Sequence, residues 1–322
     1  MAYIHYQGSD YLLEEGETVL DGLLRHGVTN VAFSCKAGAC QSCLMQTAHD
    51  ASPPLAAQRG LKETLKSKGY FLACQCRPKE DLTIQTPDEE GLSCLATLVE
   101  KKPLAPEITL LRMKPEAGFS WRAGQFVSLV HPEDPQIIRS YSIASLPETG
   151  LLELHIRHMP QGRMSAWAKA AALGDSLSLR GPAGDCFYLA ADKTVPLILA
   201  GTSTGLAPLL GIMRDALASG HTGKIFLFHG ALNADGLYLE DMLNQWQHKH
   251  PNITYKPCVL ANGQDIVAEM KAAIASLNLA KAQAYFCGAP EIVGILKKAA
   301  FLAGVSSQNI LSDGFLLAPP PR

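Results

Sequence analysis

Three of the chain's nine cysteines lie within one short segment, C-K-A-G-A-C-Q-S-C, which begins at Cys35. The spacing C-x4-C-x2-C, followed by a distant fourth cysteine, is the ligand pattern of a plant-type 2Fe–2S cluster. A loop with this spacing has to curl around the cluster with its amides directed at the sulfurs. The small residues Ala37, Gly38, Ala39 and Ser42 allow the backbone to come that close. The segment therefore predicts a cluster-binding loop.

Two cysteines further along the chain compete to be the fourth ligand. Cys74 ends the segment F-L-A-C, which is typical of a strand that runs into the site, and Cys76 follows shortly after it. We favour Cys74 and expect Cys76 to be a neighbouring free thiol. Zinc is the alternative metal, but zinc sites usually pair one C-x2-C unit with a second unit or with histidines. The predicted cluster ligands are Cys35, Cys40, Cys43 and Cys74.

Residues 1–88 resemble a plant-type ferredoxin domain, which implies a β-grasp fold and a 2Fe–2S cluster. The segment L-A-C-Q around Cys74 is similar to the closing motif of that family. One position departs from the family pattern. Where the family usually reads C-G-x-C, this chain has Gln41 after Cys40. The backbone at Gln41 must therefore tolerate a side chain in a place that glycine usually holds.

The composition predicts several soluble domains. A chain of 322 residues that is 47% hydrophobic exceeds one ordinary core, so we expect two or three domains. A net charge of −2 without a basic stripe argues against a nucleic-acid partner. No signal peptide is visible, and the longest apolar stretch, from Val195, is too short to span a membrane. We expect a cytoplasmic protein with reduced thiols, and histidines that are structural or at the surface.

Residues 92–190 have the apolar–polar alternation of strands, with proline and glycine at short intervals, which predicts an antiparallel β-barrel. A short linker, Pro87–Gly91, precedes them. The segment R-S-Y-S places Arg139 and Tyr141 on one face of a strand. A guanidinium can hold a flavin phosphate, and an aromatic ring can support the flavin ring. Ser142 can hydrogen-bond the edge of that ring.

The segment G-R-M-S-A-W, from Gly162, predicts a turn and a helix start whose free amides accept a phosphate. Each of the two motifs alone is common, in strands or as an ordinary helix cap. In this order, followed by G-D-S-L-S-L-R-G, they resemble the flavin domain of ferredoxin–NADP reductases. That resemblance implies catalytic roles for Tyr141 and Ser142. It implies flavin contacts by Arg139, Ser140, Tyr141, Ser142, Gly162, Arg163, Met164 and Ser165.

Residues 191–322 alternate between strand and helix patterns, which predicts an α/β domain with a parallel sheet. An apolar strand over 196–200 is followed by the turn G-T-S-T-G and then a helix. Glycine lets the backbone approach a pyrophosphate, and the helix start supplies amides and the positive end of its dipole. The predicted nucleotide contacts in this turn are Gly201, Thr202, Ser203, Thr204 and Gly205.

The segment F-C-G-A-P stands where another strand should end, and ligands bind at the carboxyl ends of strands in open α/β sheets. A buried cysteine that caps the strand is the alternative. The resemblance to ferredoxin–NADP reductases implies that Cys287 and Gly288 lie near the nicotinamide and that Cys287 is catalytic. It also implies an aromatic residue stacked on the flavin near the C-terminus. Phe315 is the candidate, with ordinary packing before a frayed tail as the alternative.

The nucleotide is expected to be NADH. The turn after the second strand of the α/β domain, H-G-A-L-N-A-D-G-L-Y, contains no Arg or Lys to hold the 2′-phosphate of NADPH. Asn233 and Asp235 could instead bond a ribose hydroxyl, while Arg214 on the preceding helix is the residue that could favour NADPH. FAD is implied by the resemblance to relatives with a leading ferredoxin domain, although no residue here separates FAD from FMN.

In this order the three segments resemble the electron-transfer reductase components of bacterial oxygenases, of the benzoate dioxygenase reductase and methane monooxygenase reductase type. The resemblance implies transfer from NADH through FAD and the cluster to a protein acceptor, a terminal oxygenase or an intermediate ferredoxin. NADH delivers two electrons as hydride, a cluster accepts one at a time, and a flavin does both. The alternatives are a reductase for another acceptor, such as a deoxysugar dehydrase, and a ferredoxin-like binding module that senses redox state.

Overall fold

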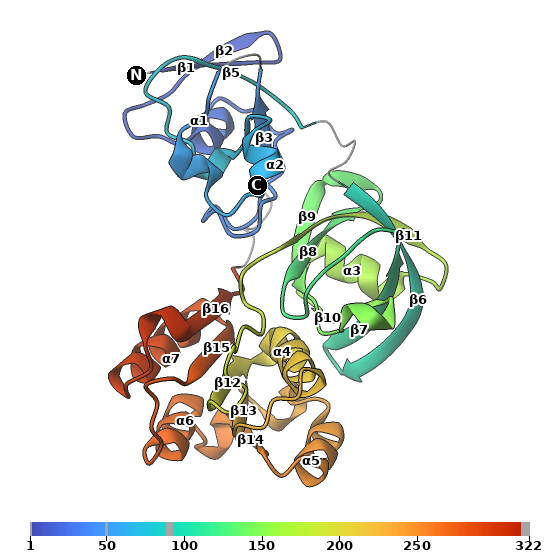
Figure 1. Ribbon diagram of the computed structural model, residues 1–322. Coiled ribbons are helices and arrows are strands. Elements are labelled where there is room, and N and C mark those ends of the chain that lie inside the picture. The colour runs from blue at the N-terminus through green and yellow to red at the C-terminus, as the bar shows by residue number, and fades with distance from the viewer. Residues whose placement is uncertain (1, 49–50, 88–92, 317–322) are drawn as a thin grey trace.

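The computed structural model describes residues 2–48, 51–87 and 93–316, which form three β-sheets with helices packed against them (Figure 1). The sheets follow one another along the chain, from the blue N-terminal body through the green strands to the yellow and red α/β body. None of the described helices has the length and apolar character of a membrane span. Residues 88–91 of the predicted linker lie outside the described residues.

The first sheet has the strand order β2-β1-β5-β3-β4, in which β1 and β5 are parallel and the other neighbours are antiparallel. Ile4 of β1 packs with Leu20 and Leu23 of α1 in its core, and burying each such side chain contributes about 1.5–3 kcal/mol. The helix begins after Thr18, whose side chain accepts a hydrogen bond from the Asp21 amide. The elements are β1 (Tyr3–Tyr6), β2 (Ser9–Leu12), α1 (Val19–Arg25), β3 (Leu44–Thr47), η1 (Leu55–Gln58), α2 (Glu63–Lys66), β4 (Tyr70–Leu72), η2 (Ala73–Gln75) and β5 (Leu82–Gln85).

The second sheet has the order β10-β7-β6-β11-β8-β9, and each of these neighbouring pairs is antiparallel. A bridge between Ile143 and Leu154 joins the two edges, so the sheet curls back on itself as the sequence predicts for a barrel. Met164 and Ala168 of the helix α3 complete the apolar core inside it. The elements are β6 (Ser93–Ala105), β7 (Ile108–Pro115), β8 (Phe126–His131), β9 (Asp134–Ser142), η3 (Pro147–Thr149), β10 (Leu152–Arg157), α3 (Arg163–Ala170) and β11 (Ser176–Ala183).

The third sheet is parallel throughout, with the order β14-β13-β12-β15-β16. One face packs against Leu209 of α4 and Leu243 of α5, and the other against Met270 of α6 and Leu296 of α7. Figure 1 shows these helix pairs on opposite sides of the sheet. The elements are β12 (Leu197–Thr202), η4 (Ser203–Gly205), α4 (Leu206–Ala218), β13 (Ile225–Ala231), η5 (Ala234–Gly236), α5 (Glu240–Lys249), β14 (Ile253–Val259), η6 (Leu260–Asn262), α6 (Ile266–Ile274), β15 (Gln283–Gly288), α7 (Pro290–Leu302), η7 (Ser307–Asn309) and β16 (Ile310–Gly314).

The strand order of the third sheet fixes where a ligand can bind. The chain starts at the central strand β12, extends to β13 and β14 on one side, and then crosses to β15 and β16 on the other. The carboxyl ends of β12 and β15 therefore flank the point where the order reverses, which is the ligand crevice of open α/β sheets. The predicted strand over 196–200 is two residues longer at its end, because Gly201 and Thr202 continue β12.

Candidate functional site

The loop between α1 and β3 brings three predicted cluster ligands together. Cys40 and Cys43 are buried and Cys35 is half-buried. The amides of Cys35 and Cys40 lie 3.4 Å from the sulfurs of Cys40 and Cys35 respectively, and the Ala37 amide lies 3.3 Å from the Cys35 sulfur. The loop therefore directs backbone donors at its sulfurs, as its small residues predict, and such donors stabilise negative charge on thiolates.

The four predicted ligands fall into two pairs. A hydrogen bond with the Cys35 thiol lowers the pKa of Cys40, and a hydrogen bond with the Cys43 thiol lowers the pKa of Cys74. Among the described residues no three His, Cys, Asp or Glu side chains are grouped so that they could hold a single metal ion. Four thiols arranged two by two are instead the donor set that suits a cluster of two irons.

Cys76, the rival for the fourth position, lies in a different environment. Its side chain is fully buried in the core of the first sheet, and burial raises its pKa to about 12. Its backbone carbonyl accepts a hydrogen bond from the Val19 amide at 2.8 Å, at the start of α1. These surroundings are those of a structural thiol, because an apolar environment disfavours the thiolate that binds metal.

Gln41 has a left-handed backbone, with φ of 57°. This conformation costs a non-glycine residue about 1–2 kcal/mol, which explains why the related motif usually has glycine there. The side-chain amide of Gln41 donates a hydrogen bond through Nε2 to the Gly60 carbonyl at 3.0 Å. The substitution thus keeps the turn that the cysteine spacing requires and adds a tether across the loop.

The predicted flavin strand, β9, has two functional faces. Ser140 lies 3.0 Å from Ser128 of β8, and both hydroxyls reach the Cys40 carbonyl, at 3.5 and 3.2 Å. Arg139 and Tyr141 lie on the other face, where both are half-buried. The Tyr141 ring packs against the barrel core, and burial raises its pKa above the ordinary value. One face of β9 therefore contacts the cysteine loop, and the other presents the guanidinium and the ring.

The predicted phosphate turn forms the start of α3. Gly162 caps the helix, and a Cβ there would lie 2.7 Å from the Ser165 hydroxyl. That hydroxyl donates to the Gly162 carbonyl and accepts from the Met159 amide, so it fixes the turn. Arg163 pairs with Asp134 at 2.6 Å, and Met164 points into the barrel core. The backbone amides of the first turn are thus the groups that remain for a phosphate.

The G-T-S-T-G turn and the Cys-Gly pair interlock at the carboxyl ends of β12 and β15. A Cβ on Gly205 would lie 2.3 Å from the Cys287 carbonyl oxygen, and one on Gly288 would lie 2.5 Å from the Thr202 hydroxyl. The Thr202 hydroxyl accepts a hydrogen bond from the Ala289 amide at 3.1 Å. Glycine is required here because backbones approach each other closely. Thr202, Ser203 and Thr204 stay half-exposed above this junction.

The barrel and the third sheet meet at Asp313, a residue that belongs to none of the sequence motifs. The Ser142 hydroxyl donates to its carboxylate at 3.1 Å, and Asp313 is the neighbour of Cys287 across the β15–β16 pairing. Burial raises the pKa of Asp313 to about 6, although the Ser142 hydrogen bond opposes that shift. The available signal was an acidic residue within the otherwise uncharged segment I-L-S-D-G-F.

Two further residues complete this end of the crevice. Cys287 is fully buried, with its sulfur 3.7 Å from that of Cys186, and burial raises its pKa well above the ordinary value. The Phe315 amide donates to the Gly288 carbonyl at 2.7 Å, so the aromatic residue lies directly beside the Cys-Gly pair. Ser142, Asp313, Cys287 and the glycine turn therefore converge from four separate parts of the chain.

Arg214 does not face the ribose turn, contrary to the alternative considered from the sequence. Its guanidinium donates to the Ala144 carbonyl and to Glu153 of the barrel, both at 2.7 Å. The turn after β13 carries Leu232, which is 71% exposed, and Asn233, which caps η5. Because its guanidinium is bound to the barrel, Arg214 is not available to a ribose 2′-phosphate at this turn.

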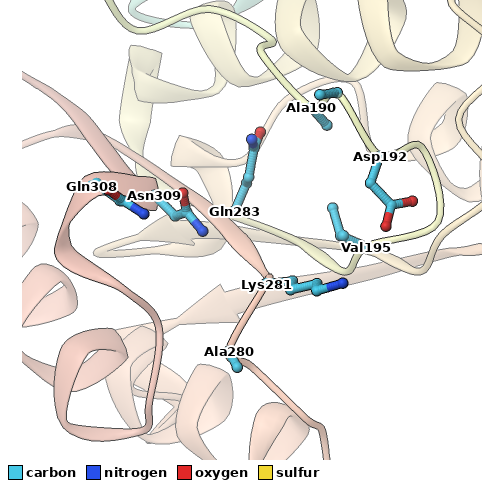
Figure 2. Close-up of a pocket in the computed structure, with 9 residues that line it drawn as sticks. Ala190, Asp192, Val195, Ala280, Lys281, Gln283, Gln308 and Asn309 are labelled. Atoms are coloured by element: carbon cyan, nitrogen blue, oxygen red, sulfur yellow. The ribbon is translucent and has the colours of Figure 1, made fainter.

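A cavity of about 370 Å³ lies at the opposite end of the third sheet (Figure 2). Its lining includes Val195, which precedes β12, Gln283, the first residue of β15, and Asn309, which precedes β16. The cavity is therefore at the amino ends of the strands, away from the crevice where ligands of such sheets bind. A second cavity, of about 350 Å³, lies between the cysteine loop and the barrel, next to Gln41 and Ser128.

Three family models match the chain in the order of its three sheets. A 2Fe-2S iron-sulfur cluster binding domain matches residues 4–79, an oxidoreductase FAD-binding domain matches 95–188, and an oxidoreductase NAD-binding domain matches 197–298. These matches confirm the predicted order of domains and their cofactors. The four cysteines, the helix start of α3 and the glycine turn described above lie within the matched regions and fit those groups chemically.

The chain is similar over nearly its full length to known reductase components. It is 32% identical over 313 residues to the naphthalene 1,2-dioxygenase system ferredoxin–NAD(P)(+) reductase component of Pseudomonas putida, covering 93% of this chain and 94% of that protein. It is 32% identical over 269 residues to the aromatic O-demethylase reductase subunit of an Amycolatopsis species, covering 78% of each. A crystal structure of a cytochrome P450 reductase from Amycolatopsis matches with a TM-score of 0.66 and 27% identity, covering 98% of this chain and 99% of that one.

Domain order, cofactor sites and full-length similarity agree with one another. The chain therefore belongs to the family of iron–sulfur flavoprotein reductases that includes the ferredoxin–NAD(P)(+) reductase components of oxygenase systems, and it is an oxidoreductase with 2Fe–2S, FAD- and NAD-binding domains.

Proposed function

We propose that this protein takes hydride from NADH onto FAD and passes the electrons singly through the 2Fe–2S cluster to a protein acceptor. The observation that carries the proposal is the position of β9. Ser140 on this strand reaches the carbonyl of Cys40, and Ser142, two residues later, binds Asp313 beside Cys287. The strand that we assign to the flavin thus contacts both the cluster loop and the nicotinamide crevice.

We assign residues 1–88 to a β-grasp ferredoxin domain, 92–190 to an antiparallel β-barrel flavin domain and 191–322 to the nicotinamide domain. Cys35 and Cys40 hold one iron, and Cys43 and Cys74 hold the other. The pairing of these thiols and the amides directed at Cys35 and Cys40 support this assignment. The same amides stabilise the negative charge that the loop accumulates when it is loaded.

The flavin is held from both faces of the barrel edge. Arg139 and the first-turn amides of α3, at Met164 and Ser165, bind its phosphates, since both features favour oxyanions. Tyr141 supports the ring, and Ser142 binds its edge. Bound FAD supplies the chemistry that converts a two-electron hydride donor into single electrons. The protein orients the flavin, excludes water from it and fixes its distance from the cluster loop and from the nicotinamide crevice.

The nucleotide lies across the carboxyl ends of β12 and β15. Gly201 and Gly205 let the backbone approach the pyrophosphate, while Cys287 and Gly288 border the nicotinamide and Phe315 the flavin. NADH is favoured because the turn after β13 lacks Arg and Lys, and because Arg214 is bound to Glu153. Asp313 keeps its proton up to a pH of about 6, well above the range of an ordinary carboxyl, and Ser142 connects that carboxyl to the flavin edge.

The acceptor is a terminal oxygenase or an intermediate ferredoxin, and we place the protein in the cytoplasm. Relatives over more than nine-tenths of the chain are named as components of terephthalate and toluate 1,2-dioxygenase systems, which supports an oxygenase of aromatic compounds. Specificity for one acceptor depends on the surface near the cluster, where charge complementarity steers association.

An anaerobic NADH titration of the loaded protein tests the proposal, read by visible absorbance and low-temperature EPR. We expect bleaching of both flavin and cluster with a rhombic 2Fe–2S signal. Cys40→Ser should abolish cytochrome c reduction and spare ferricyanide reduction, while Cys94→Ser, at a half-buried cysteine of β6 outside the loop, should preserve both. Flavin bleaching without an EPR signal in the wild-type protein would refute electron transfer through the cluster. The protein would then be a flavin reductase without a working cluster.

A further inference from the structure

A buried polar chain connects the flavin barrel to the nucleotide crevice. Glu153 and His155 on β10 and Tyr238 after η5 are at most 3% exposed, and His229 on β13 is fully buried. The Glu153 carboxylate lies 3.3 Å from His155 Nε2, and His155 Nδ1 lies 3.0 Å from the Tyr238 hydroxyl. The His229 ring packs edge-on against Tyr238, and its Nε2 lies 3.3 Å from the Ser203 carbonyl oxygen.

The charges around Glu153 set the direction of these hydrogen bonds. Arg112 donates to this carboxylate at 2.8 Å and Arg214 at 2.7 Å. Burial would raise the pKa of Glu153, but the hydrogen bond from His155 and the charge of Arg214 outweigh it and hold the pKa below its ordinary value. Glu153 is therefore an acceptor, so His155 donates through Nε2. The remaining ring nitrogen, Nδ1, accepts the hydrogen bond from Tyr238.

His229 is a neutral donor at the far end of the chain. Burial lowers its pKa to about 4, so the ring carries one proton. The contact with the Ser203 carbonyl requires that proton on Nε2, because a carbonyl only accepts. Its Nδ1 has no hydrogen-bond partner within the described part of the chain. The ring thus makes one polar contact, and that contact is with the predicted pyrophosphate turn.

The arrangement reaches both turns that we assign to the nucleotide. Ser203 has a left-handed backbone, with φ of 52°, a conformation that is unfavourable for a non-glycine residue. The hydrogen bond from His229 helps to hold that conformation. Tyr238 ends the turn that begins at Leu232, where a ribose is expected. Figure 1 shows β10 on the side of the barrel that faces α4, the helix that carries Arg214.

We propose that the chain Glu153–His155–Tyr238–His229 positions the pyrophosphate turn and the ribose turn against the flavin barrel, so that a nicotinamide dinucleotide binds in register with the flavin. These are positioning residues, since none of them has to touch the nucleotide. The inference rests on the proposed use of NADH and adds the residues that prepare its binding site. Preformed turns bind more tightly because less conformational entropy is lost on binding.

The decisive variant is Tyr238→Phe, which keeps the ring and removes only the hydroxyl. One lost hydrogen bond of about 1 kcal/mol corresponds to about a fivefold weaker affinity. We expect that increase in the Kd of NAD⁺ for the oxidised, FAD-loaded protein, measured by isothermal titration calorimetry. The KM for NADH should rise equally, with kcat changed less than about twofold.

Tyr255→Phe is the matched control. Tyr255 is 6% exposed on the neighbouring strand β14, and its hydroxyl has no hydrogen-bond partner among the described residues. Its removal should leave the Kd unchanged. At the other end of the chain, His229→Leu should weaken NAD⁺ binding, and His229→Gln, which restores a donor at the position of Nε2, should recover most of it.

The outcomes separate this inference from the proposed function. A wild-type protein that fails to bind NAD⁺ would refute the function itself. If the wild-type protein binds and Tyr238→Phe has the same Kd as Tyr255→Phe, the positioning role is wrong. The positioning role would also be wrong if Tyr238→Phe loses FAD and has a lower Tm in proportion to its loss of activity. Such parallel losses indicate a residue that only stabilises the fold.

Discussion

The hydroxyl of Ser128 donates a hydrogen bond to the backbone carbonyl of Cys40 at 3.2 Å, so a barrel strand is joined directly to a proposed iron ligand. Ser140 approaches the same carbonyl at 3.5 Å. Beside these contacts lies the 350 Å³ cavity, so the interface is not filled by side chains. The two hydroxyls are therefore direct polar contacts between the barrel and the cysteine loop, and Ser140 lies between Arg139 and Tyr141 on β9.

Replacing both serines by alanine should slow electron transfer from flavin to cluster. Two hydrogen bonds of about 0.5–1.5 kcal/mol each total about 1–3 kcal/mol, which would lower the docked population by about five- to 150-fold. Flavin reduction by NADH should keep its wild-type rate in the single variant Ser128→Ala, which leaves the flavin contact predicted at Ser140 intact. Stopped-flow absorbance resolves the two steps. Thr97→Val with Ser176→Ala is the control, since it removes a hydroxyl pair of 2.8 Å on β6 and β11; equal slowing in the control would refute a docking role.

The fourth cluster ligand is tested by a pair of alanine variants. Cys74→Ala should lose iron and the 2Fe–2S EPR signal, because Cys43 would have no paired thiol. Cys76→Ala should retain both and lose about 1–2 kcal/mol of stability through the small cavity that it creates. Iron and sulfide analysis distinguishes the variants. Retention of the cluster in Cys74→Ala with its loss in Cys76→Ala would exchange the two assignments.

Local motifs predicted the domains well because each depends on residues close together in the sequence. The cysteine spacing, the strand–turn–helix at Gly201 and the helix start at Gly162 are all of this kind, and the structure contains each of them. Gln41 illustrates the same point, since its left-handed φ follows from its place in the cysteine loop.

Contacts between distant segments were not visible in the sequence. Asp313 approaches Ser142 only because β16 pairs with β15 and the barrel packs against that edge. Ser128 reaches Cys40 only because two domains meet. Arg214 was considered for the nucleotide, but Glu153, a barrel residue, binds it instead. Each of these relationships depends on tertiary packing, which local patterns do not encode.

Leu232→Arg should improve the use of NADPH. Leu232 is 71% exposed at the turn after β13, so a guanidinium there can reach a 2′-phosphate with a charge-assisted bond. We expect kcat/KM for NADPH to rise about tenfold, since such bonds contribute about 1.5–3 kcal/mol. Leu173→Arg, with 66% exposure, places the same charge far away on the barrel side and should have no effect. An equal rise in kcat/KM for NADPH in both variants would mean that the added net charge, and not its position at Leu232, causes the effect.

Two glycine-to-alanine changes should have opposite effects on stability. Gly205→Ala places a Cβ 2.3 Å from the Cys287 carbonyl oxygen, a backbone atom that cannot yield easily. It should cost about 1–3 kcal/mol and weaken NAD⁺ binding. Gly294→Ala in α7 meets no atom within 4 Å and should stabilise by about 0.5–1 kcal/mol. Urea unfolding measures both. A stabilised Gly205→Ala would mean that the turn and the Cys-Gly pair are not interlocked.

Asp313→Asn should flatten the dependence of stability on pH. Burial raises the pKa of Asp313 in the folded protein from 3.8 to about 6, so between those values the native state binds a proton that the unfolded state has lost. Stability from this group is therefore complete below pH 4 and is lost as pH rises through about 6. We expect the difference in Tm, variant minus wild type, to rise across that window, whereas the surface variant Asp241→Asn should follow the wild type throughout. A constant difference would mean that the pKa of Asp313 is not raised in the folded protein.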